Sequence, residues 1–500
     1  MVVALLVAPL APIVLGLALV VGDRASRPVS RHTAYLVSLT ATVLAFLAAA
    51  LVVWNRPTFD RPWVPEVEMR LHLAIDGISA PLLVLAAAIG VLVVMHARHE
   101  QPGGGPPGTF FGCLLLVIGG GVATFLVQDA ISFFVSFEVV LLPIWVLINR
   151  FGDPRDPPER TRSARTFVLY TVLGSMLMLV GILPLVFAAG SSDFATLAHH
   201  RLPAGQQTAI AAILLVGLGI KVPFWPLHSW LPRAHTIAPT AGSMLLAAVL
   251  LKMGTYGVVR LVIAPLPLGV EHLAPYIGTL VVIGILWGGL ICLVERSLKR
   301  LIAWSSIAHM GFVMLGLMSG TIIGVQAALF GNIAHGIVSA LLFVVVGGLK
   351  HRWGDDELDT ARIALRNVSP RLSFALVIGI AASLGLPGLG GFWGEVLTVF
   401  GAWSPAGSRP QVWFRVLAAV LVVGAVLVAA YGLRVLRTVW MGTTDDGKPG
   451  VADPSTDARG LELVVIGVLY ATTVLLGVLP TVLLYTTAGA VTQLLAAMGR

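Results

Sequence analysis

Fourteen long apolar segments constrain the fold of this chain more than any other feature of its sequence. Each holds about 20 mostly apolar residues, the length of α-helix that crosses a hydrocarbon core of about 30 Å. Hydrophobic residues make up 57% of the 500 residues and charged residues only 11%, which a water-soluble globule could not accommodate on its surface. We therefore predict an all-α polytopic membrane protein with about 14 transmembrane helices. Their approximate limits are 3–21, 33–54, 77–97, 109–127, 130–150, 166–188, 208–231, 240–262, 275–295, 301–318, 322–349, 371–403, 412–433 and 462–488.

Charge and cysteine content exclude several other classes of protein. The formal net charge is +8, but the basic residues stand singly or in short clusters, without the interleaved aromatic residues of a nucleic-acid surface. Cys113 and Cys292 each lie inside an apolar segment, so neither a disulfide framework nor a CxxC metal or redox site is expected. We expect no nucleic-acid partner, and no metal or cofactor held by this chain.

The distribution of lysine and arginine predicts how the segments are oriented. With Arg150, Arg260 and Arg371, which stand at segment ends, counted in the adjoining loops, 22 of the 32 basic residues lie in loops that follow odd-numbered segments, 7 lie in the even-numbered loops and the two ends, and 3 lie within segments. Loops rich in lysine and arginine usually face the cytoplasm. The odd-numbered loops are therefore predicted to be cytoplasmic, with both termini on the outer side.

Two of the segments are interrupted by residues that break helices. Pro223 and Pro226 interrupt the seventh, and the Leu-Pro-Gly-Leu-Gly-Gly run at 386–391 interrupts the twelfth. Broken helices at membrane depth are tolerated where protein or water satisfies the freed backbone, which indicates a hydrated interior. The breaks are five segments apart, an odd offset that reverses direction, so the spacing favours two inverted five-helix repeats. The predicted division is 1–108 for helices 1–3, 109–262 for the first repeat, 275–433 for the second, and 462–488 for helix 14.

Two lysines lie in the middle of apolar segments. The chain has five lysines against 27 arginines, and Lys221 and Lys252 stand about 13 and 12 residues into the seventh and eighth segments. A lysine at bilayer depth costs about 2.5 to 3.5 kcal/mol even on permissive insertion scales, so its presence indicates function. Snorkelling is the simpler alternative, but a lysine side chain reaches only about 6 Å. Thr255 and Tyr256 follow Lys252 by three and four residues and share its helix face.

Two glutamates are similarly isolated. Glu138 lies in the fifth segment, about eight residues from its outer end, and Glu395 follows the glycine break of the twelfth. Either carboxylate could bond a neighbouring backbone group or anchor another subunit. Isolated buried carboxylates are expensive and usually mark ion pathways, so a proton-transfer role is favoured for both.

Four histidines complete the candidate set. His309 follows Ser305 by four residues and His335 follows Asn332 by three, so each has a polar neighbour on its own helix face. Imidazole exchanges protons near physiological pH, although either histidine could instead be a satisfied packing residue. The other two, His228 and His235, lie at the junction after the seventh segment. A local hydrogen-bonding role is favoured for His228, and for His235 it weighs equally against proton transfer.

No other chemistry competes with proton transfer. The sequence has no Walker A motif, no GxGxxG after a strand, no HExxH and no nucleophile elbow. An ion pair between Glu138 and Lys221 would hold the lysine protonated, and its separation would release the proton toward Lys252. Sequence alone does not place these residues in contact. The predicted proton-transfer residues are Glu138, Lys221, Lys252, His309, His335 and Glu395, with His235 as a further candidate.

Three blocks of sequence resemble a known family. They are KVPFWPLHSWLPRAHTIAPTAGSMLLAAVLLKMGTYGVVR, RSLKRLIAWSSIAHMGFV and IAHGIVSALLF. Together they resemble the antiporter-like membrane subunits of respiratory complex I and of multisubunit sodium/proton antiporters, over residues 70 to 440. The LPxAHxxAPTAGS block is highly specific, and the fourteen segments and the inverted repeat match that fold as well.

Within this family, Glu395 points to one branch. The L-type and N-type subunits and the antiporter subunits typically carry lysine at this position, whereas M-type subunits carry glutamate. The resemblance implies a proton-translocating, M-type membrane-arm subunit of NADH:quinone oxidoreductase, with a multisubunit sodium/proton antiporter subunit as the alternative. It also implies roles for the candidate residues: Glu138 and Lys221 as a modulating pair, Lys252 as the central relay, His309 and His335 as connecting groups, and Glu395 as the terminal proton site.

The resemblance also implies partners and a location. FMN, iron–sulfur clusters and quinone are expected in partner subunits, and L-type and N-type antiporter-like subunits are expected as neighbours. The chain is expected in the bacterial plasma membrane, in contact with the lipid bilayer. Two positions depart from the family pattern: Arg233 replaces an acidic residue, and Gly391 stands where many relatives have asparagine. These departures leave the proton carriers intact and concern the local hydration and gating that the resemblance implies.

Overall fold

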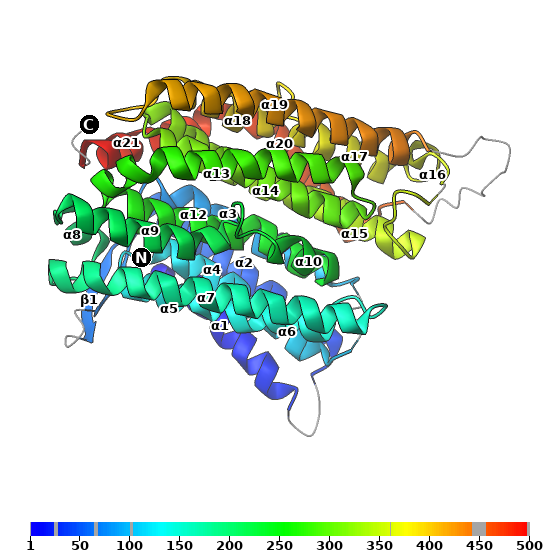
Figure 1. Ribbon diagram of the computed structural model, residues 1–500. Coiled ribbons are helices and arrows are strands. Elements are labelled where there is room, and N and C mark those ends of the chain that lie inside the picture. The colour runs from blue at the N-terminus through cyan, green and yellow to red at the C-terminus, as the bar shows by residue number, and fades with distance from the viewer. Residues whose placement is uncertain are drawn as a thin grey trace.

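The long helices of the chain lie side by side in one bundle, with their ends gathered at two opposite faces (Figure 1). The computed structural model describes residues 2–24, 29–64, 69–100, 104–360, 362–442 and 457–497. Thirteen helices in these ranges are long and apolar enough to cross a membrane, and the predicted twelfth segment supplies a further, divided one. The prediction of an all-α polytopic membrane protein is confirmed.

The N-terminal part packs through small residues. Gly16 of α1 (Val2–Gly22) lies against α4 (Pro107–Leu126), where a methyl group at position 16 would meet the carbonyl oxygen of Gly112 at 2.9 Å. Close backbone approach of this kind is how helices associate in lipid, where no hydrophobic force drives them together. The helices of this part are α1 (Val2–Gly22), α2 (Arg31–Asn55) and α3 (Ser79–Ala97).

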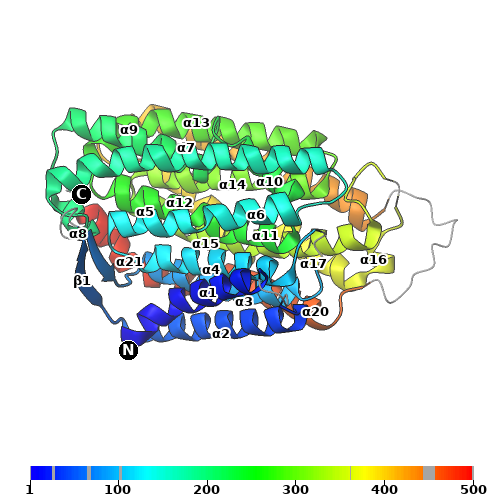
Figure 2. The same ribbon diagram turned by 90° about the horizontal axis from the view of Figure 1, so that it is seen from below.

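A β-hairpin joins α2 to α3, where the sequence indicated only a hydrophilic connection. Its strands β1 (Phe59–Val64) and β2 (Met69–Leu73) pair antiparallel, with Phe59 opposite Leu73. The hairpin lies at the end of the bundle where both chain termini are found (Figures 1 and 2). We refer to this end as the hairpin end. The two termini thus share one face, and the side of the membrane on which that face lies stays a prediction.

The next helices carry the first set of candidate residues. The predicted fifth segment is divided at Val140, and the seventh is divided between Lys221 and Trp230. The eighth is continuous but contains two π-helical turns. The elements are α4 (Pro107–Leu126), α5 (Ala130–Val139), α6 (Leu141–Phe151), α7 (Pro157–Ala189), α8 (Phe194–His199), α9 (Ala204–Lys221), α10 (Trp230–Ile237), α11 (Thr240–Leu245), η2 (Leu246–Leu250), α12 (Leu251–Gly257) and η3 (Val258–Ile263).

The C-terminal half carries the second set. The predicted twelfth segment consists of two helices, separated at residues 384–390 by the Pro- and Gly-containing run. The elements are α13 (Pro267–Val294), α14 (Leu298–Ser319), α15 (Ile322–Trp353), α16 (Leu365–Val368), α17 (Pro370–Ser383), α18 (Gly391–Trp403), α19 (Gln411–Val435), η4 (Leu436–Trp440), α20 (Gly460–Val478) and α21 (Pro480–Ala497).

The prediction of one continuous helix over residues 462–488 is wrong. The structure ends α20 at Val478 and starts α21 at Pro480. Proline has no N–H to continue the hydrogen-bond ladder, and it disfavours helical backbone at the residue before it. Leu479 accordingly leaves the helical conformation, with φ −120° and ψ 57°.

The core of the bundle lies around two helices. The apolar windows of Thr240–Ile263 and Ile322–Trp353 are each 94% buried, whereas that of α1 is 33% buried. A helix that is apolar all round and buried on all sides belongs to the interior of a bundle. These two interior helices carry Lys252 and His335.

Candidate functional site

Lys252 is fully buried at the centre of the bundle. Its Nζ donates to the carbonyl oxygen of Ala247 at 2.7 Å and to Nδ1 of His335 at 2.6 Å. Ala247 belongs to the π-helical turn η2, and a second such turn, η3, begins at Val258. Single π-helical turns inside α-helices are rare and are frequent at functional sites. Nothing in the residue pattern predicted them.

Three further predicted residues continue from Lys252 in a line. The rings of His335 and His309 have their centroids 5.7 Å apart, and Nε2 of His309 lies 3.5 Å from Oε1 of Glu395. Nε2 of His335 also contacts the hydroxyl of Ser339 at 3.1 Å. The fold therefore brings Lys252, His335, His309 and Glu395 together, although 143 positions separate the first from the last in the numbering of the chain.

Glycine residues make room for this line of side chains. A methyl group at Gly336 would lie 3.4 Å from Cε of Lys252, so the missing side chain leaves space for the lysine. Gly385 lies in the break before α18 with φ +65°, and a methyl group there would lie 2.6 Å from Oε2 of Glu395. The backbone conformation at position 385 favours glycine, and a side chain there would displace the carboxylate of Glu395. The break in the twelfth segment thus accommodates the terminal carboxylate.

Hydrogen bonds fix the surroundings of the line. Thr255 Oγ1 donates to Asn332 Oδ1 at 3.0 Å, which joins α12 to α15 one turn from the Lys252–His335 contact. His309 directs Nδ1 at the carbonyl oxygen of Ser305, 2.7 Å away, and Nε2 at that of Ser383, 3.0 Å away. Oε1 of Glu395 has no hydrogen-bond partner among the described residues. A buried carboxylate oxygen without a partner is a place where water or a proton can bind.

The expected pair of Glu138 and Lys221 takes a looser form. No ion pair within 4.0 Å joins the two side chains among the described residues. Instead, Nζ of Lys221 lies 4.4 Å from the centroid of the Phe137 ring, and Glu138 accepts a hydrogen bond from the hydroxyl of Ser175. The carboxylate of Glu138 still interacts electrostatically with Lys221. The ammonium group of Lys221 therefore lies against Phe137, the residue directly before Glu138 in the chain.

Lys221 also lies close to the helix of Lys252. A methyl group at Gly254 would lie 3.2 Å from Cβ of Lys221, so glycine at this position lets α12 approach the end of α9. The break after Lys221 places this residue at the last turn of α9, where the helix carbonyl groups lack intrahelical partners. Such carbonyl groups are a favourable environment for an ammonium group.

The two junction histidines differ in their surroundings. His235 is fully buried and stacks on Phe343, with ring centroids 4.6 Å apart, and neither ring nitrogen has a hydrogen-bond partner among the described residues. His228 packs edge-on against Trp304 at 5.4 Å. Neither histidine belongs to the line from Lys252 to Glu395. The two unsatisfied nitrogens of His235 indicate a place for ordered water.

A cavity of about 730 Å³ opens at the end of the bundle opposite the hairpin. Its wall includes Thr236–Thr240, directly after His235, together with Lys299 and Lys350. The position of Lys299 in a short loop predicts an ordinary positive-inside charge, but the structure buries this residue, which is only 3% exposed. Its Nζ donates to the carbonyl oxygen of Ala238. A short loop between two helices gives no sequence signal that the other half of the chain will cover it.

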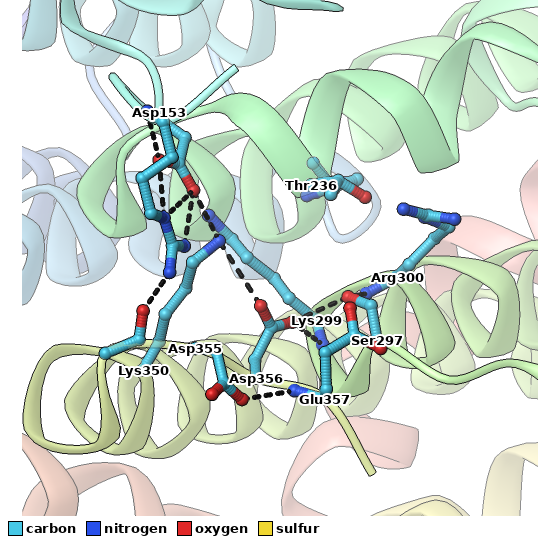
Figure 3. Close-up of polar contacts among 12 residues, drawn as sticks. Asp153, Thr236, Ser297, Lys299, Arg300, Lys350, Asp355, Asp356 and Glu357 are labelled. Atoms are coloured by element: carbon cyan, nitrogen blue, oxygen red, sulfur yellow. Dashed lines mark hydrogen bonds and ion pairs between the residues drawn. The ribbon is translucent and has the colours of Figure 1, made fainter. Parts of the chain in front are cut away.

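Charged residues from both halves of the chain meet beside this cavity. Lys350 lies 2.8 Å from Asp153 and 3.3 Å from Asp356, and Figure 3 shows its side chain reaching toward both. Asp153 also accepts from Arg155, whose guanidinium donates to the carbonyl oxygen of Gly354. Burial alone would raise the pKa of Asp153, but the hydrogen bonds from Arg155 and Lys350 hold that pKa well below its usual range.

Replacing Asp153 with asparagine is expected to destabilise the protein at neutral pH by about 1 to 2 kcal/mol, because charge-assisted hydrogen bonds are lost. The folded pKa of Asp153 is depressed. Its contribution is therefore present above the ordinary carboxyl pKa of about 3.9 and is lost as the pH falls toward the folded value. Thermal melting of the detergent-solubilised protein should show a difference from the unsubstituted protein at pH 7 that narrows below pH 4. Asp359→Asn is the control, because Asp359 and its partner Arg296 are 57% and 75% exposed.

Comparison with known proteins shows which family the chain is similar to. The family model described as "NADH:quinone oxidoreductase/Mrp antiporter, TM" matches residues 127–423. The chain is 37% identical over 387 residues to an NAD(P)H-quinone oxidoreductase chain 4 1 of Synechococcus sp., covering 77% of this chain and 72% of that protein. It is 33% identical over 493 residues to NADH-quinone oxidoreductase subunit M of Rhodobacter capsulatus, covering 94% and 92%.

Solved structures show the same fold. A chain of respiratory complex I from Thermus thermophilus with bound NADH superposes with a TM-score of 0.86 at 27% identity, covering 99% of this chain and 100% of that chain. A chain of the Mrp complex from Dietzia sp. superposes with a TM-score of 0.82 at 21% identity, covering 97% of this chain but only 52% of that chain. The second match shows a common fold alone.

Proposed function

The chain belongs to the family of NADH:quinone oxidoreductase/Mrp antiporter membrane subunits, and from this premise we propose that it is the M-type, proton-translocating membrane-arm subunit of an NADH:quinone oxidoreductase. The observation that carries the proposal is the buried line of Lys252, His335, His309 and Glu395. All four side chains exchange protons, and buried ionisable groups in a membrane are expensive unless they have such a task. The line runs from one half of the chain to the other.

The first transfer takes place between Lys252 and His335. Protonated Lys252 donates to the lone pair of His335 Nδ1 across 2.6 Å. An N–H bond at Nζ breaks as one forms at Nδ1, which leaves a neutral amine and an imidazolium. The carbonyl oxygen of Ala247 holds the ammonium in position through a second hydrogen bond. A group that accepts a proton must lie within hydrogen-bond reach, and this pair meets that condition without rearrangement.

The later transfers lead to Glu395. Water bridges the space between the rings of His335 and His309, whose centroids are 5.7 Å apart. His309 Nε2 then passes a proton to Glu395, whose Oε1 lies 3.5 Å away. Glu395 is the terminal proton site of the relay. Glu138 modulates Lys221 through its charge, and Lys221 supplies the proton that reaches Lys252.

Proton uptake takes place from the cavity opposite the hairpin. The cavity wall includes Thr236, the residue directly after His235, and neither ring nitrogen of this buried histidine has a hydrogen-bond partner among the described residues. Loops rich in lysine and arginine lie at the cavity end, which supports a cytoplasmic position for this end of the bundle. The hairpin end and both termini are then on the periplasmic side of a bacterial plasma membrane. His235 links the cavity to the relay.

Electron transfer belongs to other subunits in this proposal. FMN, iron–sulfur clusters and quinone are held by partners, because the relay of this chain consists only of lysine, histidine and glutamate side chains that move protons. L-type and N-type antiporter-like subunits are its neighbours in the membrane arm. The chain acts as a translocating subunit of the enzyme without holding a redox centre. Its apolar outer helices contact these neighbours and the lipid bilayer.

The alternative is a subunit of a multisubunit sodium/proton antiporter. The Mrp chain shares the fold, but this chain covers only 52% of its length. Glu395 favours the M-type assignment, since lysine is expected at this position in antiporter subunits. Affinity purification of the chain from its native membrane separates the two proposals. Co-purification of flavin- and iron–sulfur-containing subunits with NADH oxidation supports the oxidoreductase, and sodium/proton exchange without these subunits supports the antiporter.

Replacing Glu395 with glutamine is expected to lower NADH-driven proton pumping by about tenfold or more, because the terminal proton site is lost while its size is kept. The measurement is acidification of inverted membrane vesicles, with assembly checked by co-purification. Glu159→Gln is the matched control, because Glu159 is a half-buried carboxylate in the first turn of α7 that takes no part in the line from Lys252 to Glu395. If assembled Glu395→Gln complexes pumped as well as the control, Glu395 would not be the terminal site.

A further inference from the structure

A charged pair closes the hairpin end of the helix that carries Lys252. Arg260 lies on η3, eight residues after Lys252, which is about 12 Å along the helix. Its guanidinium forms an ion pair with Asp76, and the two side chains are 12% and 37% exposed. Asp76 Oδ1 accepts from the backbone N–H groups of Ile78 and Ser79, both at 2.9 Å. The pair is thus fixed to the start of α3, with the carboxylate toward the surface and the cation beneath it.

Aromatic rings fill the space between this pair and the two lysines. Tyr256 is 1% exposed, and the guanidinium carbon of Arg260 lies 5.1 Å from its ring centroid. The Tyr256 ring packs on Phe125 at 5.5 Å and on Phe133 at 6.1 Å. Phe133 in turn contacts Phe137, the ring that lies under the ammonium group of Lys221. One aromatic layer therefore lies on the hairpin side of both lysines.

We propose that Asp76 and Arg260, together with Tyr256, Phe125 and Phe133, form a seal that prevents protons on Lys221 and Lys252 from leaving at the hairpin end. We refer to these five residues as the outer seal. This inference rests on the proposed function, since a seal is needed only if these lysines carry protons. It gives the relay its direction: a proton on Lys252 can move on through His335 to Glu395, but not directly outward along its own helix.

The chemistry of arginine suits a group that blocks protons and not one that transfers them. A guanidinium keeps its proton in proteins, so Arg260 cannot take up and release protons as a lysine or histidine does. Its fixed positive charge disfavours the approach of an additional proton, which is how arginine excludes protons from narrow membrane pores. Asp76 compensates the charge from the surface side and so makes its burial tolerable.

Two unsatisfied groups lie within the seal. The hydroxyl of Tyr256 and Nε of Arg260 have no hydrogen bond of standard geometry among the described residues, although the two side chains interact with each other and Tyr256 also interacts with Gln128. A water bound there would accept from the guanidinium, so its lone pairs would point at the cation and would not be free to bind a proton. Phe125 and Phe133 pack against the Tyr256 ring, and apolar rings offer a water chain no hydrogen-bond partners. Water at this position would complete the barrier.

The test is the passive proton permeability of membranes that contain the whole complex. A pH gradient is imposed on vesicles without NADH, and its decay is followed with a pH-sensitive dye. Arg260→Gln is expected to accelerate the decay about threefold or more, because the cation barrier is removed. Arg260→Lys keeps the positive charge and is expected to retain most of the barrier. Tyr256→Ala keeps the ion pair, opens the aromatic layer and is expected to leak as well.

Two controls make the result specific. Arg70→Gln removes an arginine from an exposed ion pair with Asp60 at the same end, and it should leave the decay unchanged. Adding Lys252→Met to Arg260→Gln should return the decay to near that of the unsubstituted complex, because the leak passes through Lys252. The proposed seal would be overturned if the pH gradient decayed no faster in assembled Arg260→Gln and Tyr256→Ala complexes than in the unsubstituted complex. It would also be overturned if adding Lys252→Met did not slow the decay in the Arg260→Gln complex. Failure of the proposed function is a separate result: Lys252→Met alone would then pump normally.

Discussion

Replacing Lys252 with alanine is expected to lower NADH-driven proton pumping about tenfold or more in vesicles that contain the assembled complex, because a proton-transfer group of this kind contributes a factor of about 100 or more. The substitution removes the only side chain that hydrogen-bonds His335 Nδ1 from α12. It also frees the carbonyl oxygen of Ala247. Acidification of inverted vesicles and quinone reduction should be measured together, since a blocked relay in a tightly coupled pump also slows electron transfer.

Cavity formation is the main competing explanation for such a loss. Leu251→Ala is the matched control, because Leu251 is also fully buried on α12 and its truncation leaves a comparable space without removing a charge. Lys252→Met is a second variant that keeps most of the side-chain volume. We expect Leu251→Ala to pump and Lys252→Met to fail. Normal pumping by assembled Lys252→Ala complexes would show that the chain is a structural spacer and not a pump.

The candidate residues could be chosen from the sequence, but their contacts could not. Lys252 and Glu395 are conspicuous because charged groups in long apolar segments are costly. That Lys252 bonds His335, 83 positions away, is a property of how α15 packs against the eighth segment, and no local pattern encodes it. The same limit applies to Glu138 and Lys221, which the resemblance implied as a modulating pair: the described residues show no ion pair between them, and Lys221 Nζ lies over the ring of Phe137.

Some irregularities of the helix backbone could be predicted from the sequence and others could not. The proline and glycine runs marked where the seventh and twelfth segments are interrupted, because these residues cannot continue a helix. The π-helical turns on either side of Lys252 have no such signal, since Leu246–Leu250 is an ordinary helix-forming stretch. The break at Pro480 was not predicted, because the residues on both sides of this proline continue one long, mostly apolar segment. The inverted relation of the two repeats rests on spacing alone and stays a prediction.

Buried charges outside the apolar segments were the least predictable feature. Lys299, Asp153 and Lys350 belong to loops or helix ends, where charged residues are ordinarily solvated. Their burial results from the meeting of two loops that are distant in sequence, joined by the Asp153–Lys350 ion pair of 2.8 Å. Composition and loop position therefore predicted the side of the membrane for these residues but not their environment.

Replacing His335 with leucine is expected to reduce pumping to nearly the level of Lys252→Ala, because His335 is the only described side chain that contacts Lys252 Nζ and also packs against His309. Leucine fills similar space but accepts no proton. His335→Gln keeps a hydrogen-bonding group that cannot carry a proton. If proton transfer through position 335 is required, this variant should lose pumping as fully as His335→Leu does. If only packing matters, it should pump normally. Each variant is measured by vesicle acidification, with co-purification as the check on assembly.

His228→Gln is the matched control for this substitution, since His228 is also a buried histidine but contacts Trp304 away from the line. We expect its pumping to stay within about twofold of the unsubstituted protein, because no transfer in the relay depends on it. The double variant Lys252→Met/His335→Leu should be no worse than either single variant, because one interrupted step already stops a serial relay. Independent, multiplicative losses would instead mean that Lys252 and His335 act on separate paths, and the relay as drawn from Lys252 to Glu395 would be wrong.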